Sequence, residues 1–214
     1  MRARRVGLAG IVAACALSVA LLPPATATAA KKKTIGSDLK GTPTPGTGYS
    51  CGLTGPCAIA QIKLPGDPHG TRAPFKGVLR KWRFRTTDED PEGSYGLRLA
   101  VVRKVGAGAS GDGEPVDTRF RFVRRTAEKI VGPEPGTYRF KARLKVKKGD
   151  FIALELPYGP DNPSVQEFYV PHADALDYSW FPAPPPGSAD NPYEANAETE
   201  YLYNATIKKK KKRR

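Results

Sequence analysis

Two histidines are the first candidates for acid–base or metal chemistry in this chain. His69 and His172 both lie beside Pro or Gly, in stretches that we expect to be loops. His172 could join Asp174 or Asp177 in a Ser-His-Asp arrangement, but the chain has no Gly-x-Ser-x-Gly elbow. A zinc site needs three or four ligands, and no cysteine is spare to complete one. We therefore predict no catalytic residue and no enzymatic activity.

Carboxylates offer two further kinds of chemistry. Pairs drawn from Asp88–Asp90 or Glu194–Glu200 could serve a secreted hydrolase, although any exposed acidic loop has the same sequence. Oxygen ligands on loops also suit Ca²⁺, and Lys and Arg are absent between Gly149 and Ile207. Solvated loop carboxylates are the alternative, and no EF-hand spacing occurs. The candidate calcium ligands are Asp161, Asp174, Asp177, Asp190 and Glu194. No other cofactor is expected.

Aromatic residues near the C-terminal prolines could recognise a sugar. Tyr178, Trp180 and Tyr193 lie among prolines, where they could form a stacking platform or plug the open end of a sandwich. The platform would make the protein a carbohydrate-binding module that binds a polysaccharide, with or without Ca²⁺.

The end of the chain is a run of cations that bury nothing and repel one another. It would attract an anionic cell-wall polymer or membrane surface at about 1 kcal/mol per charge, or serve only as a solubilising end. We expect no nucleic acid as a partner of an exported protein. The run comprises Lys208, Lys209, Lys210, Lys211, Lys212, Arg213 and Arg214.

The whole chain has a net charge of +14. Charge is also distributed unevenly within the body of the chain, between its two basic ends. Between Lys63 and Lys148 there are 21 basic and 10 acidic residues, whereas Gly149–Ile207 has 10 acidic residues and no Lys or Arg. Oppositely charged strands could neutralise one another in a sheet. Alternatively, one face of the domain carries the charge and suits an anionic partner.

Residues 1–30 have the features of a secretory signal peptide. A basic start precedes the apolar run Val6–Leu22, and small residues that suit cleavage follow Pro23 and Pro24. The run is short for a bilayer span, and no later segment is apolar enough to be transmembrane. Val12–Cys15 also fits a loose lipoprotein box, in which Cys15 would be acylated. We expect a secreted or surface-associated protein.

Cys51 and Cys57 would both remain in the exported chain. Two Gly and one Pro lie between them and allow a sharp reversal, so we predict a disulfide. A redox pair would need closer Cys-x-x-Cys spacing at a helix N-terminus.

A period of two dominates the middle of the chain and predicts strands rather than helices. Tyr138–Val146 alternates without error between core-forming residues and cations, and Val78–Arg85 alternates in a similar way. Gly and Pro punctuate about nine such segments. The pattern predicts an all-β fold, a single antiparallel β-sandwich of jelly-roll type with disordered basic ends. We expect a linker at 31–50, the sandwich at 51–207 and a disordered tail at 208–214.

Several segments resemble a group of uncharacterised secreted proteins from high-GC Gram-positive bacteria. They are Cys51 with Cys57, Ile62–Gly66, Ala73–Arg83, Leu97–Leu99, Ala142–Asp150 and Tyr201–Ala205. The resemblance implies one exported β-sandwich, often with a basic end, and carries over no catalytic residue. Lys145 stands where the group would have Pro. Taken together, the sequence predicts an exported, non-catalytic binding or structural module of the cell envelope.

Overall fold

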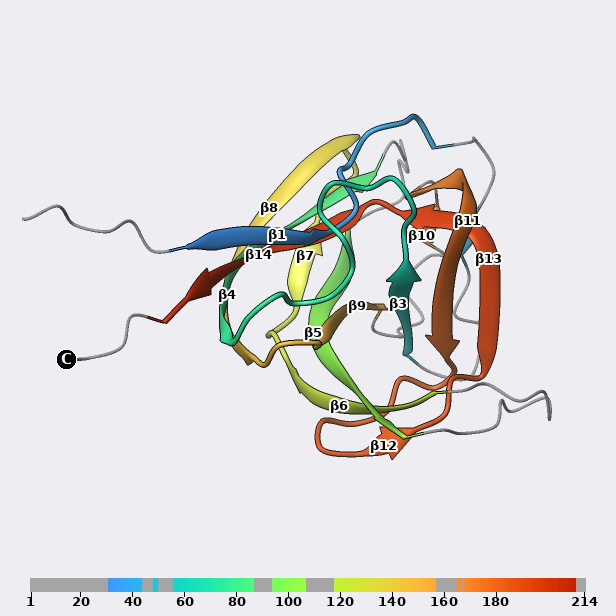
Figure 1. Cartoon of the computed structure of the whole chain (residues 1–214). Helices are drawn as coiled ribbons and strands as arrows, with labels where there is room; N and C mark the ends of the chain where they lie inside the picture. The colour runs from blue at the N-terminus through green and yellow to red at the C-terminus, as the bar shows by residue number, and fades with distance from the viewer. Residues whose placement is uncertain are drawn as a thin grey trace, which may run out of the picture.

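The computed structural model describes residues 31–43, 48–49, 56–86, 94–106, 118–156, 165–166 and 168–210 of the chain. These residues form strands joined by turns (Figure 1). The strands are β1 (Lys32–Gly36), β2 (Gly48–Tyr49), β3 (Cys57–Lys63), β4 (Gly77–Thr86), β5 (Tyr95–Gly106), β6 (Arg119–Arg125), β7 (Lys129–Val131), β8 (Gly136–Val146), β9 (Phe151–Leu156), β10 (Val165–Gln166), β11 (Tyr169–Trp180), β12 (Ala189–Asp190), β13 (Glu194–Tyr201) and β14 (Tyr203–Lys209).

Two antiparallel sheets pack together, which confirms the predicted β-sandwich. The four-stranded sheet has the order β1-β14-β4-β8. The eight-stranded sheet has the order β12-β6-β5-β9-β3-β11-β13, and β7 pairs with β5 beside this path. β2 and β10 form a separate two-stranded ladder. The sheets are thus built largely from strands distant in sequence, and the two ends of the described chain, β1 and β14, are neighbours.

The main core lies between the two sheets. Trp82 and Phe84 of β4 are fully buried, and they share this core with Leu99 of β5 and Leu154 of β9. Tyr203 of β14 reaches across the interface: its hydroxyl accepts a bond from the Gln61 amide (3.1 Å) and lies 2.9 Å from the Ile59 carbonyl. Burial of this kind supplies most of the stabilisation of a sandwich.

A second core covers the other face of the eight-stranded sheet. Small residues on its central strands, such as Ala60 and Ala153, leave room for rings from β6 and β11. Trp180 meets Phe120 and Phe122 edge to face, with ring centroids 5.5 and 5.1 Å apart. The segment after β11 then crosses to β6, where β12 pairs. Both faces of β9 are therefore covered, and all six of its residues are buried.

The structure corrects three expected boundaries. The segment 31–50, expected to be a linker, contains β1, which pairs with β14 from Lys32 to Gly36. The tail expected to start at Lys208 is ordered to Lys209 as the end of β14. Residues 200–207, one of the strand segments expected from the sequence, are divided between β13 and β14, because the chain bends at Leu202 and passes from the eight-stranded to the four-stranded sheet. The fully buried Leu202 side chain holds this bend.

Candidate anion-binding face

The four-stranded sheet carries positive charge and no negative charge. β1 and β14 each contain two Lys or Arg residues and β4 and β8 contain four each, while none of these strands contains Asp or Glu. We call ten of these side chains, those on the outer side of the sheet, the cationic face. Its members are Lys32, Arg80, Lys81, Arg83, Arg85, Arg139, Lys141, Arg143, Lys145 and Lys208.

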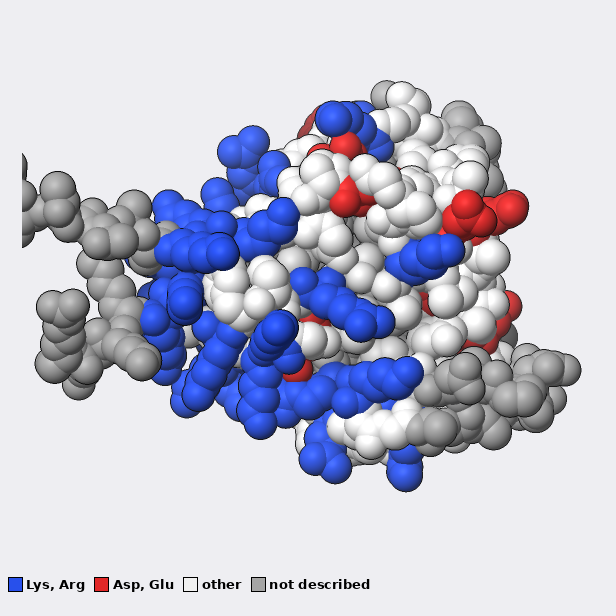
Figure 2. Space-filling view, in the orientation of Figure 1, with Lys and Arg blue, Asp and Glu red and all other residues white. Residues whose placement is uncertain are grey.

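The charge separation seen along the sequence is also a separation in space. Figure 2 shows Lys and Arg gathered on the side of the molecule where β1, β14 and β4 lie and along its lower edge, whereas Asp and Glu are few on that side and more frequent toward the top and the right. From the acid-rich half of the chain only β14 enters the four-stranded sheet, and its residues from Tyr203 to Ile207 are uncharged. Neutralisation between neighbouring strands therefore does not occur in this sheet.

Like charges face each other directly across the ladders of this sheet. Lys81 of β4 opposes Lys141 of β8, and Arg83 opposes Arg139 on the same two strands. At the outer edge, Lys32 of β1 opposes Lys208 of β14. Like charges in direct opposition destabilise a sheet by about 0.2–1 kcal/mol per pair. The cationic face thus persists at a cost to stability.

An irregularity in β4 adds one more cation to the face. Both ladders of β4 shift register at Arg80, so that Arg80 and Lys81 are exposed in succession before Trp82 returns to the core. The strict alternation expected for Val78–Arg85 is therefore wrong at this point. β-Bulges re-aim side chains and are frequent beside functional sites.

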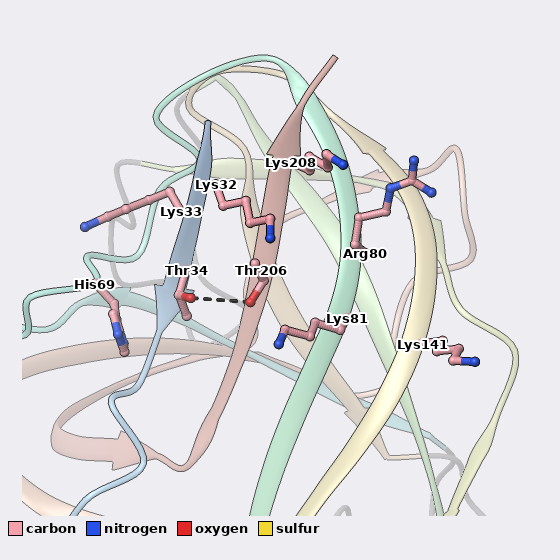
Figure 3. Close-up of a pocket in the computed structure, with 9 residues that line it drawn as sticks. All are labelled: Lys32, Lys33, Thr34, His69, Arg80, Lys81, Lys141, Thr206 and Lys208. Carbon is pink, nitrogen blue, oxygen red and sulfur yellow. Dashed lines mark hydrogen bonds between the residues drawn. The ribbon is translucent and has the colours of Figure 1, made fainter. Parts of the chain in front are cut away.

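A groove lies on the cationic face where β1, β14, β4 and β8 run side by side. Lys32 and Lys81 point toward Thr34 and Thr206, whose hydroxyl oxygens are 3.4 Å apart (Figure 3). The groove has a volume of about 810 Å³. Its lining is Lys32, Lys33, Thr34, His69, Arg80, Lys81, Lys141, Thr206 and Lys208.

The cations of this face have no acidic partner among the described residues. Arg83 donates to the Asn204 side chain (3.0 Å) and Arg85 to the Leu39 carbonyl (2.7 Å), both of which are neutral acceptors. The eight-stranded sheet differs, since Arg98 and Arg125 both bind the buried Glu155. Strand-to-strand neutralisation therefore holds in one sheet and fails in the other.

A smaller cationic pocket lies at the end of the sheet from which the C-terminal tail leaves. Its volume is about 320 Å³. Asp150 accepts two bonds from Arg103 (2.7 and 2.9 Å), and this hydrogen bonding raises the pKa of the guanidinium. The other cations of its lining are Lys76, Arg124, Lys145, Lys147 and Lys210. At the start of the polybasic tail, Lys208 lines the groove and Lys210 lines the smaller pocket. Residues 211–214 lie outside the described residues.

The structure does not bring the expected calcium ligands together into one site. Asp161 lies outside the described residues, and Asp174 and Asp190 are exposed. Asp177 is fully buried on β11 near Glu194, but its carboxylate faces Asn196. Burial raises the pKa of Asp177 to about 7. Sequence spacing could not reveal that three other carboxylates, Asp38, Asp67 and Glu200, gather instead.

Of the two alternatives for Tyr178, Trp180 and Tyr193, a platform for sugar stacking does not fit two of the three residues. Trp180 is 1% exposed and Tyr178 is 9% exposed, and both belong to the second core. Tyr193 alone is exposed, at 55%, and it contacts Phe181 edge to face. Tyr178 and Trp180 of β11 pack against Phe120 of β6, so neither ring is free to stack on a sugar.

The cysteines and histidines named in the sequence analysis are the remaining candidate residues. Cys57 is fully buried at the start of β3, and the predicted disulfide stays a prediction because Cys51 lies outside the described residues. His69 Nδ1 lies 3.2 Å from the Ser37 carbonyl, and His172 lies 4.0 Å from Glu200. The predicted signal peptide, Cys15 and Asp88–Asp90 also lie outside the described residues.

In the part of the chain that the structure describes, no helix is long and apolar enough to cross a membrane. No family model, curated protein or solved structure matches this chain. Its function must therefore be inferred from its own surface.

Proposed function

We propose that this protein is an exported, non-enzymatic binding module that holds an anionic polymer of the cell envelope on its cationic face. The observation that carries the proposal is the direct opposition of Lys81 with Lys141 and of Arg83 with Arg139 on a sheet without a single acid. A bound polyanion would screen this repulsion, and the relief of the repulsion would add to the free energy of binding.

The shape of the face favours an extended polymer over a small anion. The four outward cations of β8 alternate with core residues, so they recur about every 6.8 Å along the strand, twice the rise per residue. They are Arg139, Lys141, Arg143 and Lys145. The neighbouring strand adds a second row, and the groove lies between the rows and the edge of the sheet. A linear chain with repeated phosphate or carboxylate groups can contact such rows along its length.

Location and avidity come from the two ends of the chain. The predicted signal peptide would deliver the domain outside the cytoplasm, where anionic wall polymers are present. Lys210 continues from β14 into the rest of the polybasic run. Each added cation near an anionic surface contributes about 1 kcal/mol. The tail would therefore strengthen a contact that the folded face selects.

Cosedimentation with purified cell walls tests the proposal. The mature protein should pellet with walls that retain their anionic polymers and be released by raising salt from about 50 to about 500 mM, as expected for displacement of counterions. Walls stripped of these polymers, and anionic liposomes, serve as alternative surfaces. Preferential binding to liposomes would contradict the choice of a wall polymer.

Variants locate the contact. Replacing both Lys81 and Lys141 by Gln should weaken binding roughly 30-fold, at about 1 kcal/mol per lost cation. The matched control replaces Lys63 and Lys129 by Gln, which removes the same charge from β3 and β7. Equal losses in the two double variants would mean that only net charge matters and would overturn the assignment to this face.

The contribution of the tail to binding is measured with a truncation that leaves β14 complete. Ending the chain after Lys210 removes 211–214 and leaves the Lys208 and Lys209 pairings intact. We expect weaker but still salt-sensitive binding. Complete loss of binding would assign the activity to the tail and exclude a recognition role for the sheet.

A further inference from the structure

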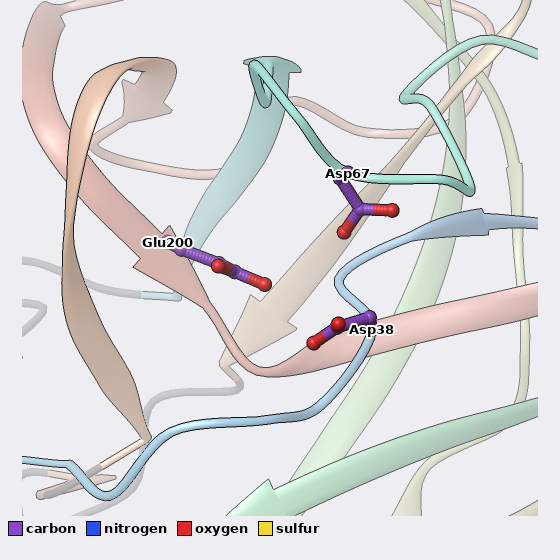
Figure 4. Close-up of side chains that lie close together, drawn as sticks. All are labelled: Asp38, Asp67 and Glu200. Carbon is purple, nitrogen blue, oxygen red and sulfur yellow. The ribbon is translucent and has the colours of Figure 1, made fainter.

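Three carboxylates from distant parts of the sequence converge at one edge of the sandwich. Asp38 follows β1, Asp67 lies in the connection from β3 to β4, and Glu200 is the penultimate residue of β13, just before the passage to β14. One oxygen of each lies within 4.8 Å of the others. Figure 4 shows the three side chains directed toward a common space.

Two of these carboxylates are removed from water. Glu200 is 6% exposed, and its Oε1 atom is buried without a hydrogen-bond partner. The Asp67 side chain is 3% exposed. Burial raises the pKa of Glu200, and the neighbouring Asp67 and Asp38 raise it further. Several negative charges at this depth are costly unless a cation compensates them.

The protein groups around the cluster do not supply that compensation. Lys40 lies 3.1 Å from Asp38, but its own side chain is largely exposed, so the pair is worth little. Asp67 Oδ1 accepts a bond from the His69 amide (2.5 Å) and lies 3.7 Å from Nδ1 of the His69 ring, while Glu200 Oε2 lies 4.0 Å from the His172 ring. Each imidazole compensates a carboxylate only when it is protonated. Ser37 hydrogen-bonds the Glu200 carboxylate. None of these contacts engages Glu200 Oε1.

We propose that Asp38, Asp67 and Glu200 bind a calcium ion, with Glu200 Oε1 as one of its ligands. An all-oxygen donor set, supplied by two connecting segments and the end of a strand, suits Ca²⁺ better than a metal that requires nitrogen or sulfur. The ion would join the exit of β1, the connection before β4 and the end of β13. The three carboxylates do not belong to the cationic face, although His69, which lines the groove on that face, also contacts Asp67. The calcium titration itself does not depend on polyanion binding.

Calorimetric titration of the mature protein with CaCl₂, after dialysis against EDTA, tests the site. We expect one ion per chain and a rise in the unfolding temperature when calcium is added, because a ligand of the folded state stabilises it. Asp67→Asn and Glu200→Gln should each weaken calcium binding by at least about tenfold, since each removes a charged ligand. Glu198→Gln, on the same strand and exposed, is the matched control and should bind as the parent does.

The result can also overturn the proposal. Absence of binding heat at millimolar CaCl₂, together with an unchanged unfolding temperature, would show that the cluster holds a proton rather than a metal. An equal loss in Glu198→Gln would show a diffuse charge effect. In EDTA, Glu200→Gln should unfold at or above the temperature of the parent, because it removes a buried charge. If that variant does not fold, Asp38→Asn at the most accessible ligand carries the same test.

Discussion

Lys81 of β4 and Lys141 of β8 are direct cross-strand neighbours on the outer side of the four-stranded sheet. The next residue pair on the same two strands, Trp82 and Phe140, points to the inner side of the sheet, where the two rings pack with centroids 4.5 Å apart. The core contact fixes the register, and the register in turn forces the two ammonium groups to the same place. The stability of the fold and the repulsion on its surface therefore have one geometric origin.

Reversing one of these charges should separate stability from binding. Lys141→Glu converts the repulsive pair with Lys81 into an attractive one, so the free energy of unfolding should rise by about 0.5 kcal/mol. Binding to anionic walls should fall roughly 30-fold, because the local charge changes by two. Urea unfolding and cosedimentation measure the two effects. A variant that is less stable and binds as tightly would contradict both expectations.

The buried and exposed aromatic residues should respond differently to truncation. Trp180→Ala leaves a large cavity beside Phe120 and Phe122 and should cost about 3–5 kcal/mol of unfolding free energy. Tyr193→Ala, at an exposed site, should change stability by less than about 0.5 kcal/mol. Denaturant unfolding gives both numbers, and polysaccharide binding lost in Tyr193→Ala alone would restore a glycan role for that ring.

The buried Asp177 should make the fold less stable as pH rises from about 4 to about 7. Burial raises its folded-state pKa to about 7 from the ordinary value of 3.8, so in this window the unfolded chain loses the proton first. Unfolding temperatures from pH 4 to pH 8 should show the decline, with a levelling above pH 7. In Asp177→Asn, which keeps the shape and the neighbour Asn196 without a titrating charge, this component should disappear. An unchanged pH profile in that variant would assign the decline to other groups.

The predicted Cys51–Cys57 disulfide should stabilise the start of β3. Closing such a small loop is worth about 2 kcal/mol by the loop-entropy argument. Thiol titration of the unfolded, unreduced mature protein should detect no reactive thiol, and reduction should lower the unfolding free energy. Detection of two thiols before reduction would rule the disulfide out.

The sandwich could be predicted from the sequence because period-two patterns are local. Tyr138–Val146 shows its two faces without reference to any other strand, and β8 has the predicted alternation. The passage at Leu202 could not be predicted, because the residues on both sides of it suit a strand equally well. The segment is divided because Tyr201 pairs with β11 in one sheet, whereas Tyr203 pairs with β4 in the other. In the same way, nothing local distinguishes Trp180 as a core ring, since its burial depends on Phe120 and Phe122 from another strand.

The sequence by itself determined the kind of fold, the outward row of cations on β8 and the imbalance of charge between the two halves of the chain. Alternation and composition carry these properties, and neither depends on which strands become neighbours. The tertiary structure decided that β4, β8, β14 and β1 share one sheet, that their cations face one another without acids, and that Asp38, Asp67 and Glu200 meet. Pairing between distant strands determines those contacts, because a sheet places side by side residues that the chain keeps far apart.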